Sequence, residues 1–268
     1  MRLLSYMSPT IPADFLRELA RQIQQRTGIE TDTMFESCRS GPSLAELSSA
    51  LDPFSLGKAD VCHLCAPTYV RARRRGVLEL LGYTPIFYDK RSAGKPVYYS
   101  DVLVPSKSEV TQFEELKGRS WAYNDKESLS GYFSMLYFLQ QRGEAADFFS
   151  RAICSGGHRD SLELLRRGES DCAAIDGNLL LFLTRENSVP ETRKVAEIGP
   201  FPAPPLALRT SLARSVKSTL RSVMTELRAD RESMDLLRER YLLSDFVPVT
   251  DDHYTPVEQI LNELGMST

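Results

Sequence analysis

The chain has 268 residues, of which 42% are hydrophobic and 26% charged, and its formal net charge at pH 7 is −3. A chain of this size and composition buries a substantial core, in one large domain or two smaller ones. The slightly acidic balance argues against a nucleic-acid-binding surface, and no apolar segment approaches the roughly 20 residues that a membrane-spanning helix needs.

Strand-like and helix-like segments alternate at the start of the chain. Apolar periodicity predicts strand 2–6, helix 13–27, strand 30–36, helix 44–51, strand 59–64 and helix 68–75. The last of these helices ends at Gly76, a residue type that favours helix C-termini. This alternation predicts a doubly wound βα unit.

A second α/β unit follows an extended crossing. The crossing is predicted as two consecutive strands, 78–88 and 97–104. The alternation then restarts with strand 120–123, helix 131–142, strand 151–154, helix 161–167, strand 172–175 and helix 179–185.

The last part of the chain is expected to return to the first unit. Strand 194–198 leads into GPFPAPPLAL, whose prolines exclude a helix and predict an extended connector with one further strand. The helices expected after it are 211–228, 231–241 and 255–264.

We therefore expect an α/β fold with two lobes, each built on a doubly wound mixed sheet. The first lobe would contain residues 1–100 and 201–268, and the second would contain residues 101–200. Two extended hinge crossings, near 97–104 and 196–205, would let the lobes close on a ligand.

The most informative segment is WAYNDKESLSGYFSMLYFLQ, residues 121–140, which predicts a strand, a polar loop and a helix opened by Ser and Gly. The unpaired N–H groups and partial positive charge of such a helix start suit a phosphate-like or carboxylate anion. Ser128 and Ser130 add hydroxyl donors, and Gly131 permits close approach of the backbone. A serine-capped helix with nothing bound is the alternative interpretation.

Three further polar residues are expected at the same edge of the second sheet. Ligands of parallel α/β sheets lie beyond the carboxyl ends of the strands. Asn124 and Asp176 each follow a predicted strand, and His158 precedes a predicted helix. His158 can donate to an anionic oxygen and Asp176 can accept from a ligand donor, although a helix cap and a turn would also explain these two residues.

The number of cysteines and the N-terminal residues indicate the cellular compartment of the protein. Five cysteines are an odd number, which favours a reducing compartment over a disulfide framework, and CHLC at 62–65 lacks a second pair of metal ligands. The start, MRLLSYMSPTIPADF, lacks the apolar core and cleavage site of a secretory leader. We therefore expect a cytoplasmic protein, or a periplasmic or extracytoplasmic one if a leader has been removed.

Several segments, in order, resemble the substrate-binding proteins of phosphate, phosphite and phosphonate ABC transporters. They are GKADVCHLCAPTYV, KPVYYSDVLVPSKS followed by FEELKGRSWAYND, ESLSGY, GGHRDSLELLRRGESDCAAIDG and PPLALRTSL. Together they cover most of the chain. The resemblance to this phosphonate-binding-protein family implies a two-lobed fold like that of type II periplasmic binding proteins.

The resemblance also implies roles for single residues. The Ser-Leu-Ser run at 128–130 corresponds to the family's Ser-Thr-Ser run, which holds the phosphonate or phosphate group. Tyr98 corresponds to a tyrosine that contacts the ligand, and His158 to a histidine that contacts the anion. Asp176 lies where members carry a polar residue at the edge of the pocket.

Departures from the family pattern concern the rest of the ligand. Leu129 replaces the hydroxyl residue in the middle of the run and leaves only its backbone amide as a donor. MFESCRSGPSL lacks the Asp-Tyr pair of aminoalkylphosphonate binders, so the non-anionic part of the ligand is expected to differ. The residues expected to line that side are Ser8, Glu36, Ser37, Cys38, His63 and Cys65, the last standing where glycine is common.

The leading functional hypothesis is the binding of a small phosphorus oxyanion or organic phosphonate by hinge closure, as a solute-binding protein, intracellular sensor or carrier. It needs no metal or cofactor, and an ABC permease would be a partner only if the protein is exported. The alternative is a cytosolic enzyme on the same fold, of the menaquinone- or thiamine-pathway type, acting on a small carboxylated or phosphorylated metabolite. His158, Asp176 and Cys65 would then supply acid–base or nucleophilic chemistry, but no catalytic motif is visible, which favours binding.

Overall fold

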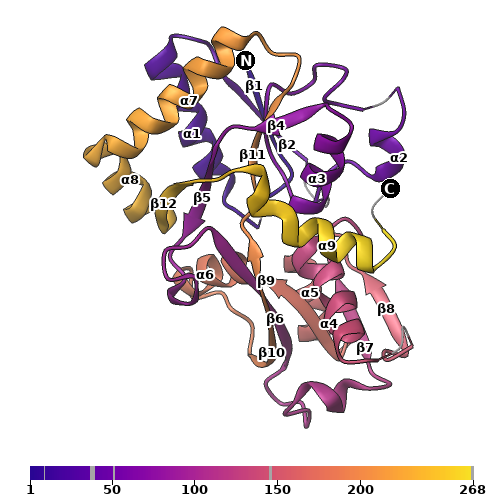
Figure 1. The fold of residues 1–268 in the computed structure, drawn as a ribbon. Helices are drawn as coiled ribbons and strands as arrows, with labels where there is room; N and C mark the ends of the chain where they lie inside the picture. Colours follow the sequence, from indigo (N-terminus) through magenta and orange to yellow (C-terminus); the bar gives the residue numbers. More distant parts are fainter. Residues whose placement is uncertain (9, 37–39, 51, 145–146, 267–268) are drawn as a thin grey trace.

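The computed structural model describes residues 1–8, 10–36, 40–50, 52–144 and 147–266. They form a mixed α/β fold whose two main sheets lie in separate lobes, one above the other in Figure 1. The two-lobed architecture expected from the sequence is confirmed. The exact lobe boundaries, near residues 100 and 200, stay a prediction.

The sheet of the first lobe contains strands from both ends of the chain. Its strand order is β2 (Asp32–Phe35), β1 (Arg2–Ser5), β3 (Val61–His63), β11 (Leu206–Arg209) and β4 (Leu78–Leu80). β1 pairs in parallel with β2 and β3, whereas β11 is antiparallel to β3 and β4. The helices of these parts of the chain are α1 (Ala13–Thr27), α2 (Leu44–Leu47), α3 (Ala66–Arg74), α7 (Arg214–Ala229), α8 (Arg231–Tyr241) and α9 (Thr255–Glu263).

Helix α1 shows how the sequence directs packing. Phe15, Leu16, Leu19 and Ile23 recur at helical spacing and are all buried, so one face of the helix packs against the lobe. Each such side chain contributes roughly 1.5–3 kcal/mol on full burial. The helix ends at Gly28, whose φ of 69° is the left-handed conformation that glycine adopts without strain.

The sheet of the second lobe places three parallel strands beside two long antiparallel ones. Its strand order is β10 (Thr192–Pro202), β6 (Val97–Pro105), β9 (Cys172–Asp176), β7 (Ser120–Tyr123) and β8 (Arg151–Cys154). β7 pairs in parallel with β8 and β9. The helices of this lobe are the π-helical turn η3 (Leu129–Phe133), which continues into α4 (Ser134–Gln141), and α5 (His158–Arg167) and α6 (Gly177–Arg185).

The two expected crossings run side by side, because β6 and β10 pair antiparallel along most of their length. Both strands lie in the sheet of the second lobe, and β11 follows β10 after a short connection into the sheet of the first lobe. Short 3-10 helices in the described ranges are η1 (Lys90–Ser92), η2 (Phe113–Leu116) and η4 (Asp251–Tyr254).

Three features of the fold differ from the sequence-based expectation. The single strand predicted at 78–88 is wrong: the chain turns at Gly82, where φ is 101°, and separates β4 from β5 (Tyr83–Phe87). β5 pairs with β12 (Leu243–Pro248), a strand that we did not predict, in a small sheet of two strands. In addition, the helix expected at 161–167 begins earlier, at His158.

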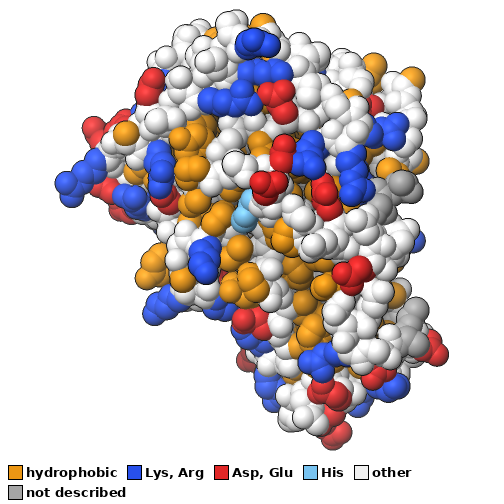
Figure 2. Space-filling model, in the orientation of Figure 1, with side chains coloured by type: hydrophobic (Ala, Val, Ile, Leu, Met, Phe, Trp, Pro, Cys, Tyr) orange, Lys and Arg blue, Asp and Glu red, His pale blue; other side chains and the backbone are white. Residues whose placement is uncertain are grey.

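The surface gives no sign of a single extended charged region on the face shown in Figure 2, where Lys and Arg side chains alternate with Asp and Glu. On the same face, apolar side chains gather around the waist between the upper and lower lobes. No helix in the described part of the chain has both the length and the apolar character needed to cross a membrane.

Candidate functional site

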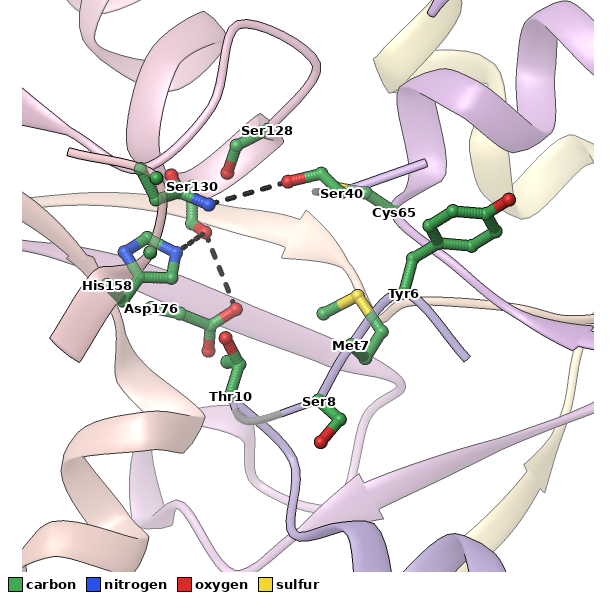
Figure 3. A pocket seen from close by; sticks show the side chains of 13 residues that line it. Tyr6, Met7, Ser8, Thr10, Ser40, Cys65, Ser128, Ser130, His158 and Asp176 are labelled. Carbon is green, nitrogen blue, oxygen red and sulfur yellow. Dashed lines mark hydrogen bonds between the residues drawn. The ribbon is translucent and has the colours of Figure 1, made fainter. Parts of the chain in front are cut away.

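A small cavity of about 30 Å³ lies between the two lobes, at the carboxyl ends of β1, β3, β7, β8 and β9. This is the edge at which ligands of α/β sheets are expected. Figure 3 shows residues of the first lobe on one side of the cavity and residues of the second lobe on the other. Its lining residues are Tyr6, Met7, Ser8, Thr10, Ser40, Cys65, Asn124, Ser128, Ser130, Gly156, Gly157, His158 and Asp176.

The helix start at Ser128 forms one wall of the cavity. Ser128 caps this helix, because its Oγ accepts a hydrogen bond from the Gly131 N–H at 3.0 Å. The carbonyl of Ser130 accepts hydrogen bonds from the hydroxyls of Ser100 at 2.6 Å and Ser134 at 2.7 Å, which fixes the first turn. The N–H of Ser130, like other N–H groups at helix starts, donates to no backbone group in the described residues.

Gly131 lets this helix start lie directly against its neighbours. A Cβ at this position would lie 1.8 Å from Oδ1 of Asn124 and 3.2 Å from Cε1 of His158. Real Cβ atoms do not tolerate the first of these distances, so any side chain here must displace Asn124. Close packing, and not a left-handed φ, is the reason for glycine at this position.

Ser130, His158 and Asp176 point toward one another in the cavity (Figure 3). The Ser130 Oγ lies 3.2 Å from Nε2 of His158 and donates to Oδ2 of Asp176 at 3.4 Å. A hydroxyl that donates to Asp176 accepts from the imidazole, so His158 carries its proton on Nε2. All three side chains are buried.

Burial perturbs the pKa values of both titratable members of this group. It lowers the pKa of His158 to about 3, an effect that the nearby Ala174 carbonyl partly opposes, and the imidazole is therefore neutral. It raises the pKa of Asp176 to about 7, although the N–H of Asn178 and the hydroxyl of Ser130 donate to this carboxyl and act in the opposite direction. Asp176 also caps α6 through its hydrogen bond from Asn178 N–H, at 2.8 Å.

Contacts between the lobes surround the cavity. The Leu129 N–H donates to Sγ of Cys65 at 3.2 Å, and the Ser40 N–H donates to Oδ2 of Asp125 at 2.6 Å. Asn124 also donates to the hydroxyl of Ser40, at 3.4 Å. These contacts hold the lobes together in this structure.

Cys65 is a weak candidate for a nucleophile in this setting. Burial raises the pKa of its thiol to about 12, so the thiolate is not populated at neutral pH. Its sulfur instead accepts the hydrogen bond from Leu129.

The residues predicted from the sequence fall into three groups. Those that line the cavity are Ser8, Cys65, Asn124, Ser128, Ser130, His158 and Asp176. Those next to lining residues but outside the lining are Tyr98, Leu129 and Gly131. Those elsewhere are Glu36, whose N–H bonds to the Ser5 carbonyl, and the buried His63; Ser37 and Cys38 lie outside the described residues.

Tyr98, which was predicted to contact the ligand, lies outside the cavity lining. Its ring is buried on β6 and packs against Phe201, with ring centroids 6.3 Å apart. Burial raises its pKa well above the ordinary value, and its hydroxyl is close to Cys65 and Ser130. Tyr98 thus lies behind the helix start, and its contact with a ligand stays a prediction.

Sequence reasoning missed several lining residues. They are Tyr6, Met7, Thr10, Ser40, Gly156 and Gly157. The rule that was applied to the second lobe also identifies Tyr6 and Met7, because they follow β1 directly, and Thr10 lies a few residues further along. The two glycines precede α5 and carry a comparable signal, whereas Ser40 comes after residues outside the described part of the chain.

The lining is rich in uncharged hydrogen-bond donors and contains neither Lys nor Arg among the residues described. The starts of α4 with its preceding turn, α5 and α6 all meet at the cavity, which places the positive ends of several helix dipoles together. Asp176 is the carboxyl residue of this lining. The arrangement suits an anion that donates to Asp176 and accepts from the remaining groups.

Comparison with known proteins identifies both family and fold. The family model for the periplasmic phosphonate substrate-binding protein of ABC transporters matches residues 3–254. A binding protein component of an ABC phosphonate transporter from Pseudomonas aeruginosa is similar in structure, with a TM-score of 0.80 and 19% identity over 99% of this chain and 86% of the other.

Two further solved structures share the fold. PhnD1 from Prochlorococcus marinus, in complex with methylphosphonate, has a TM-score of 0.78 and 15% identity over 99% of this chain and 98% of that one. A protein from Xanthomonas citri bound to ATP has a TM-score of 0.72 and 15% identity over 100% of this chain and 97% of that one. These likenesses confirm the type II periplasmic-binding-protein-like fold.

The family description also bears on role and location. Its members are substrate-binding components of phosphonate ABC transporters, which confirms the prediction of a solute-binding protein. The description does not support the cytoplasmic location expected from the sequence and agrees with the periplasmic alternative. The chain belongs to the family of periplasmic substrate-binding proteins of phosphonate ABC transporters.

Proposed function

We propose that this chain binds a small phosphorus oxyanion or phosphonate in the cavity between its lobes, with Ser128, Ser130 and His158 as the principal side-chain donors. The observation that carries the proposal is the meeting of several helix starts and uncharged donors in one buried cavity. Such a site holds an anion through hydrogen bonds and helix dipoles without a cationic side chain.

Burial makes these uncharged donors effective. Hydrogen bonds to a charged group contribute about 1.5–3 kcal/mol each, and excluded water strengthens their electrostatic part. Ser130 and His158 are both almost fully buried, so solvent does not compete for their donors, which a bound anion would take over from their present acceptors, Asp176 and Ser130. The neutral state of His158 fits this role, because Nε2–H donates without adding a buried charge.

Hinge closure would couple ligand binding to the contacts between the lobes. Leu129, which lies within the proposed anion-binding turn, bonds to Cys65 of the first lobe, and Asp125 just before this turn bonds to Ser40. A ligand that bridges the lobes would favour the arrangement in which these contacts form. We propose that residues 1–100 with 201–268 and residues 101–200 move as the two bodies.

The geometry favours binding over catalysis. In a nucleophile–base–acid triad, the acid holds the base through its second ring nitrogen. Here Asp176 accepts from Ser130, and Nδ1 of His158 has no hydrogen-bond partner in the described part of the chain. The neutral thiol of Cys65 likewise offers no activated nucleophile.

The proposed role is that of the substrate-binding component of an ABC transporter, acting outside the cytoplasm and delivering its ligand to a permease. The family match supports this role. An export assay on the protein expressed in its own host would test the location, since recovery in the cytoplasmic fraction alone would contradict it.

A thermal-shift screen tests the binding proposal. The panel contains phosphate, phosphite, methylphosphonate, aminoethylphosphonate and larger carboxylated metabolites. A ligand at a hundredfold excess over its dissociation constant should stabilise the fold by roughly 2.7 kcal/mol. At least one phosphorus ligand should raise the melting temperature of the wild type.

Matched serine variants make the screen specific. Ser130→Ala should reduce the shift, whereas Ser150→Ala should not, because the hydroxyl of Ser150 bonds to the Arg119 carbonyl away from the cavity lining. A shift with carboxylated metabolites alone would contradict the proposal.

A further inference from the structure

The C-terminal segment of the chain, residues 251–266, contains η4 and α9 and lies against both lobes. In Figure 1 α9 crosses the waist of the molecule, with α3 above it and α4 below. Contacts of α9 with α3 and with β10 of the second sheet agree with this view. A segment of the first lobe therefore reaches the second lobe apart from the two hinge crossings.

Most of this segment is anchored to the first lobe. The apolar side chains of α9 that are buried in the core are Val257, Ile260 and Leu261. Asp251 accepts a hydrogen bond from the hydroxyl of Tyr69 on α3 at 2.5 Å, and Glu258 pairs with Arg73 on the same helix at 2.7 Å. Because the anchor has several separate contacts, the loss of one of them should leave it in place.

The start of the segment is attached to both hinge crossings. The imidazole of His253 donates from Nε2 to the carbonyl of Pro96, directly before β6, at 2.7 Å. The hydroxyl of Tyr254 donates to the carbonyl of Ala203, directly after β10, at 3.2 Å. The crossings are joined at this point, because the Ala203 N–H donates to the Pro96 carbonyl at 2.9 Å. The segment thus begins where the lobes would pivot, and its far end lies away from the pivot.

The end of α9 bonds to α4 of the second lobe. The side-chain amide of Gln140 donates to the backbone carbonyl of Glu263 at 3.1 Å. The side-chain amide of Gln141 donates to the carboxylate of Glu263 at 3.0 Å. Both glutamines are exposed, so water can replace these hydrogen bonds when the helices separate. Such contacts can form and break without leaving a buried polar group unpaired.

Met266 connects the segment to the ion pair between the lobes. The guanidinium of Arg71 donates to the Met266 carbonyl at 2.6 Å and pairs with Glu127 of the second lobe through its other terminal nitrogen. It also lies over the ring of Phe133 in η3, with Cζ 5.5 Å from the ring centroid. Because a guanidinium is rigid and planar, a bond that fixes one nitrogen orients the other. The last residues of the segment therefore direct Arg71 toward the second lobe.

The contact between α9 and the second lobe is not closely packed. A groove with a volume of about 290 Å³ lies between α9, α4 and β10, and its apolar lining includes Phe138, Phe201 and Ile260. Protein interiors contain few voids larger than a water molecule. The polar contacts at the end of α9 are therefore important for holding it to the second lobe, as expected of two surfaces that separate.

We infer that residues 251–266 form a latch between the lobes. Its anchored part stays with the first lobe, and its end, residues 263–266, engages the second lobe only when the lobes are closed. The latch lowers the free energy of the closed form and releases before a bound molecule leaves the cavity. This inference does not depend on which molecule binds there.

A double variant, Gln140→Ala with Gln141→Ala, tests the latch. It removes both bonds to Glu263 and introduces the residue with the highest helix propensity, so α4 should be retained. The loss of two hydrogen bonds should lower the ratio of closed to open protein by about five- to tenfold. Small-angle scattering of the ligand-free variant should therefore give a larger radius of gyration than the wild type. Phosphorus NMR exchange spectroscopy with methylphosphonate should show dissociation faster by a similar factor.

Gln24→Ala is the matched control for the double variant. Gln24 is also an exposed glutamine on a helix, and its side chain accepts from the Thr31 N–H at 3.0 Å within the first lobe. This variant should keep the wild-type radius of gyration and dissociation rate. An equal increase in radius in Gln24→Ala would overturn the latch, because the effect would not depend on a contact between the lobes.

A chain that ends at Glu263 tests the second contact of the latch. It lacks the Met266 carbonyl but keeps the buried residues of α9, and its ligand-free radius should also exceed that of the wild type. A wild-type radius of gyration in the glutamine double variant would overturn the latch, even if the shortened chain fails to fold. If methylphosphonate does not bind to the wild type, the proposed function is weakened, and the ligand-free radius alone decides the inference.

Discussion

The ion pair between Arg71 and Glu127 should control how readily the lobes close. Arg71 lies on α3 in the first lobe, and Glu127 lies in the loop before η3 in the second lobe. Their side chains are 6% and 17% exposed, so the pair is largely shielded from water. Arg71 also donates to the Met266 carbonyl at 2.6 Å, which keeps it in place. Glu127→Gln removes one charge and preserves the shape of the side chain.

The expected cost can be estimated from burial. Removing one partner of a buried ion pair costs about 3–5 kcal/mol while the other partner stays buried. Opening of the lobes returns Arg71 to water, so the cost acts on the closed form. A penalty of about 3 kcal/mol changes the ratio of closed to open protein by roughly 100-fold. If the closed form predominates tenfold in the wild type, the apparent dissociation constant rises by about tenfold or more.

A closely matched control exists on the same helix. Glu258→Gln removes one of the two partners of Arg73. This ion pair measures 2.7 Å and joins α3 to α9 without crossing to the sheet of the second lobe, and Arg73 keeps its second ion pair, with Asp251 at 3.1 Å. Glu258 is 22% exposed, close to the exposure of Glu127. The control therefore removes a carboxylate of similar exposure from a contact that does not join the lobes, beside an arginine that is more exposed than Arg71 and keeps Asp251 as a partner.

Small-angle scattering and calorimetry measure the two effects. Ligand-free Glu127→Gln should have a larger radius of gyration than the wild type, and saturating ligand should reduce the difference. Its affinity should fall, while Glu258→Gln should resemble the wild type in both measurements. An unchanged radius and affinity in Glu127→Gln would refute a closing role for this ion pair.

Three other predictions follow from the site and its buried groups. Gly131→Ala should abolish anion binding, because its Cβ would lie 1.8 Å from Oδ1 of Asn124; calorimetry that shows wild-type affinity would contradict this close packing. Burial raises the pKa of Asp176 from the usual 3.8 to about 7, so stability is lost as the pH rises between these two values and the full cost remains above about pH 7. Ligand-free Asp176→Asn should therefore exceed the wild type in stability at pH 8 by up to about 4 kcal/mol but not at pH 4, as measured by urea unfolding. Asp171→Asn should instead be less stable than the wild type at pH 8, because the pKa of this carboxyl is lowered: burial acts to raise it, but the hydrogen bonds from Ser120 outweigh burial. Burial lowers the pKa of His63 to about 3, so the wild type loses stability as the pH falls below about 6.5. His63→Gln should lose about 2–3 kcal/mol less unfolding free energy than the wild type between pH 7 and 4.5. Parallel stability profiles of the two proteins against pH would contradict a buried, neutral His63.

Local patterns predicted much of the fold. Helix α1 begins and ends where its apolar periodicity and Gly28 place it, because amphipathic spacing and a left-handed glycine are properties of the local sequence. Strand pairing was harder to predict. β12 pairs with β5, more than 150 residues earlier in the chain, so its register depends on tertiary contacts that its own residues do not encode.

The candidate site was predictable where topology controls it. Asn124, His158 and Asp176 meet because strand ends of a parallel sheet share one edge. The burial of individual side chains was not predictable in this way. Tyr98 aligns with a ligand-contacting tyrosine but packs behind the helix start, and His63 is buried within its strand. The raised pKa of Asp176 likewise depends on burial by residues distant in the sequence.

Calorimetric titration of the purified protein with methylphosphonate, phosphate and phosphite tests the central claim most directly. We predict binding of one anion per chain for at least one of these ligands. Ser130→Ala should weaken that binding by about 10- to 100-fold, the loss of one hydrogen bond to a charged group, and Ser150→Ala should leave it unchanged. Absence of binding by the wild type, or equal affinity in Ser130→Ala, would contradict an anion site at this helix start.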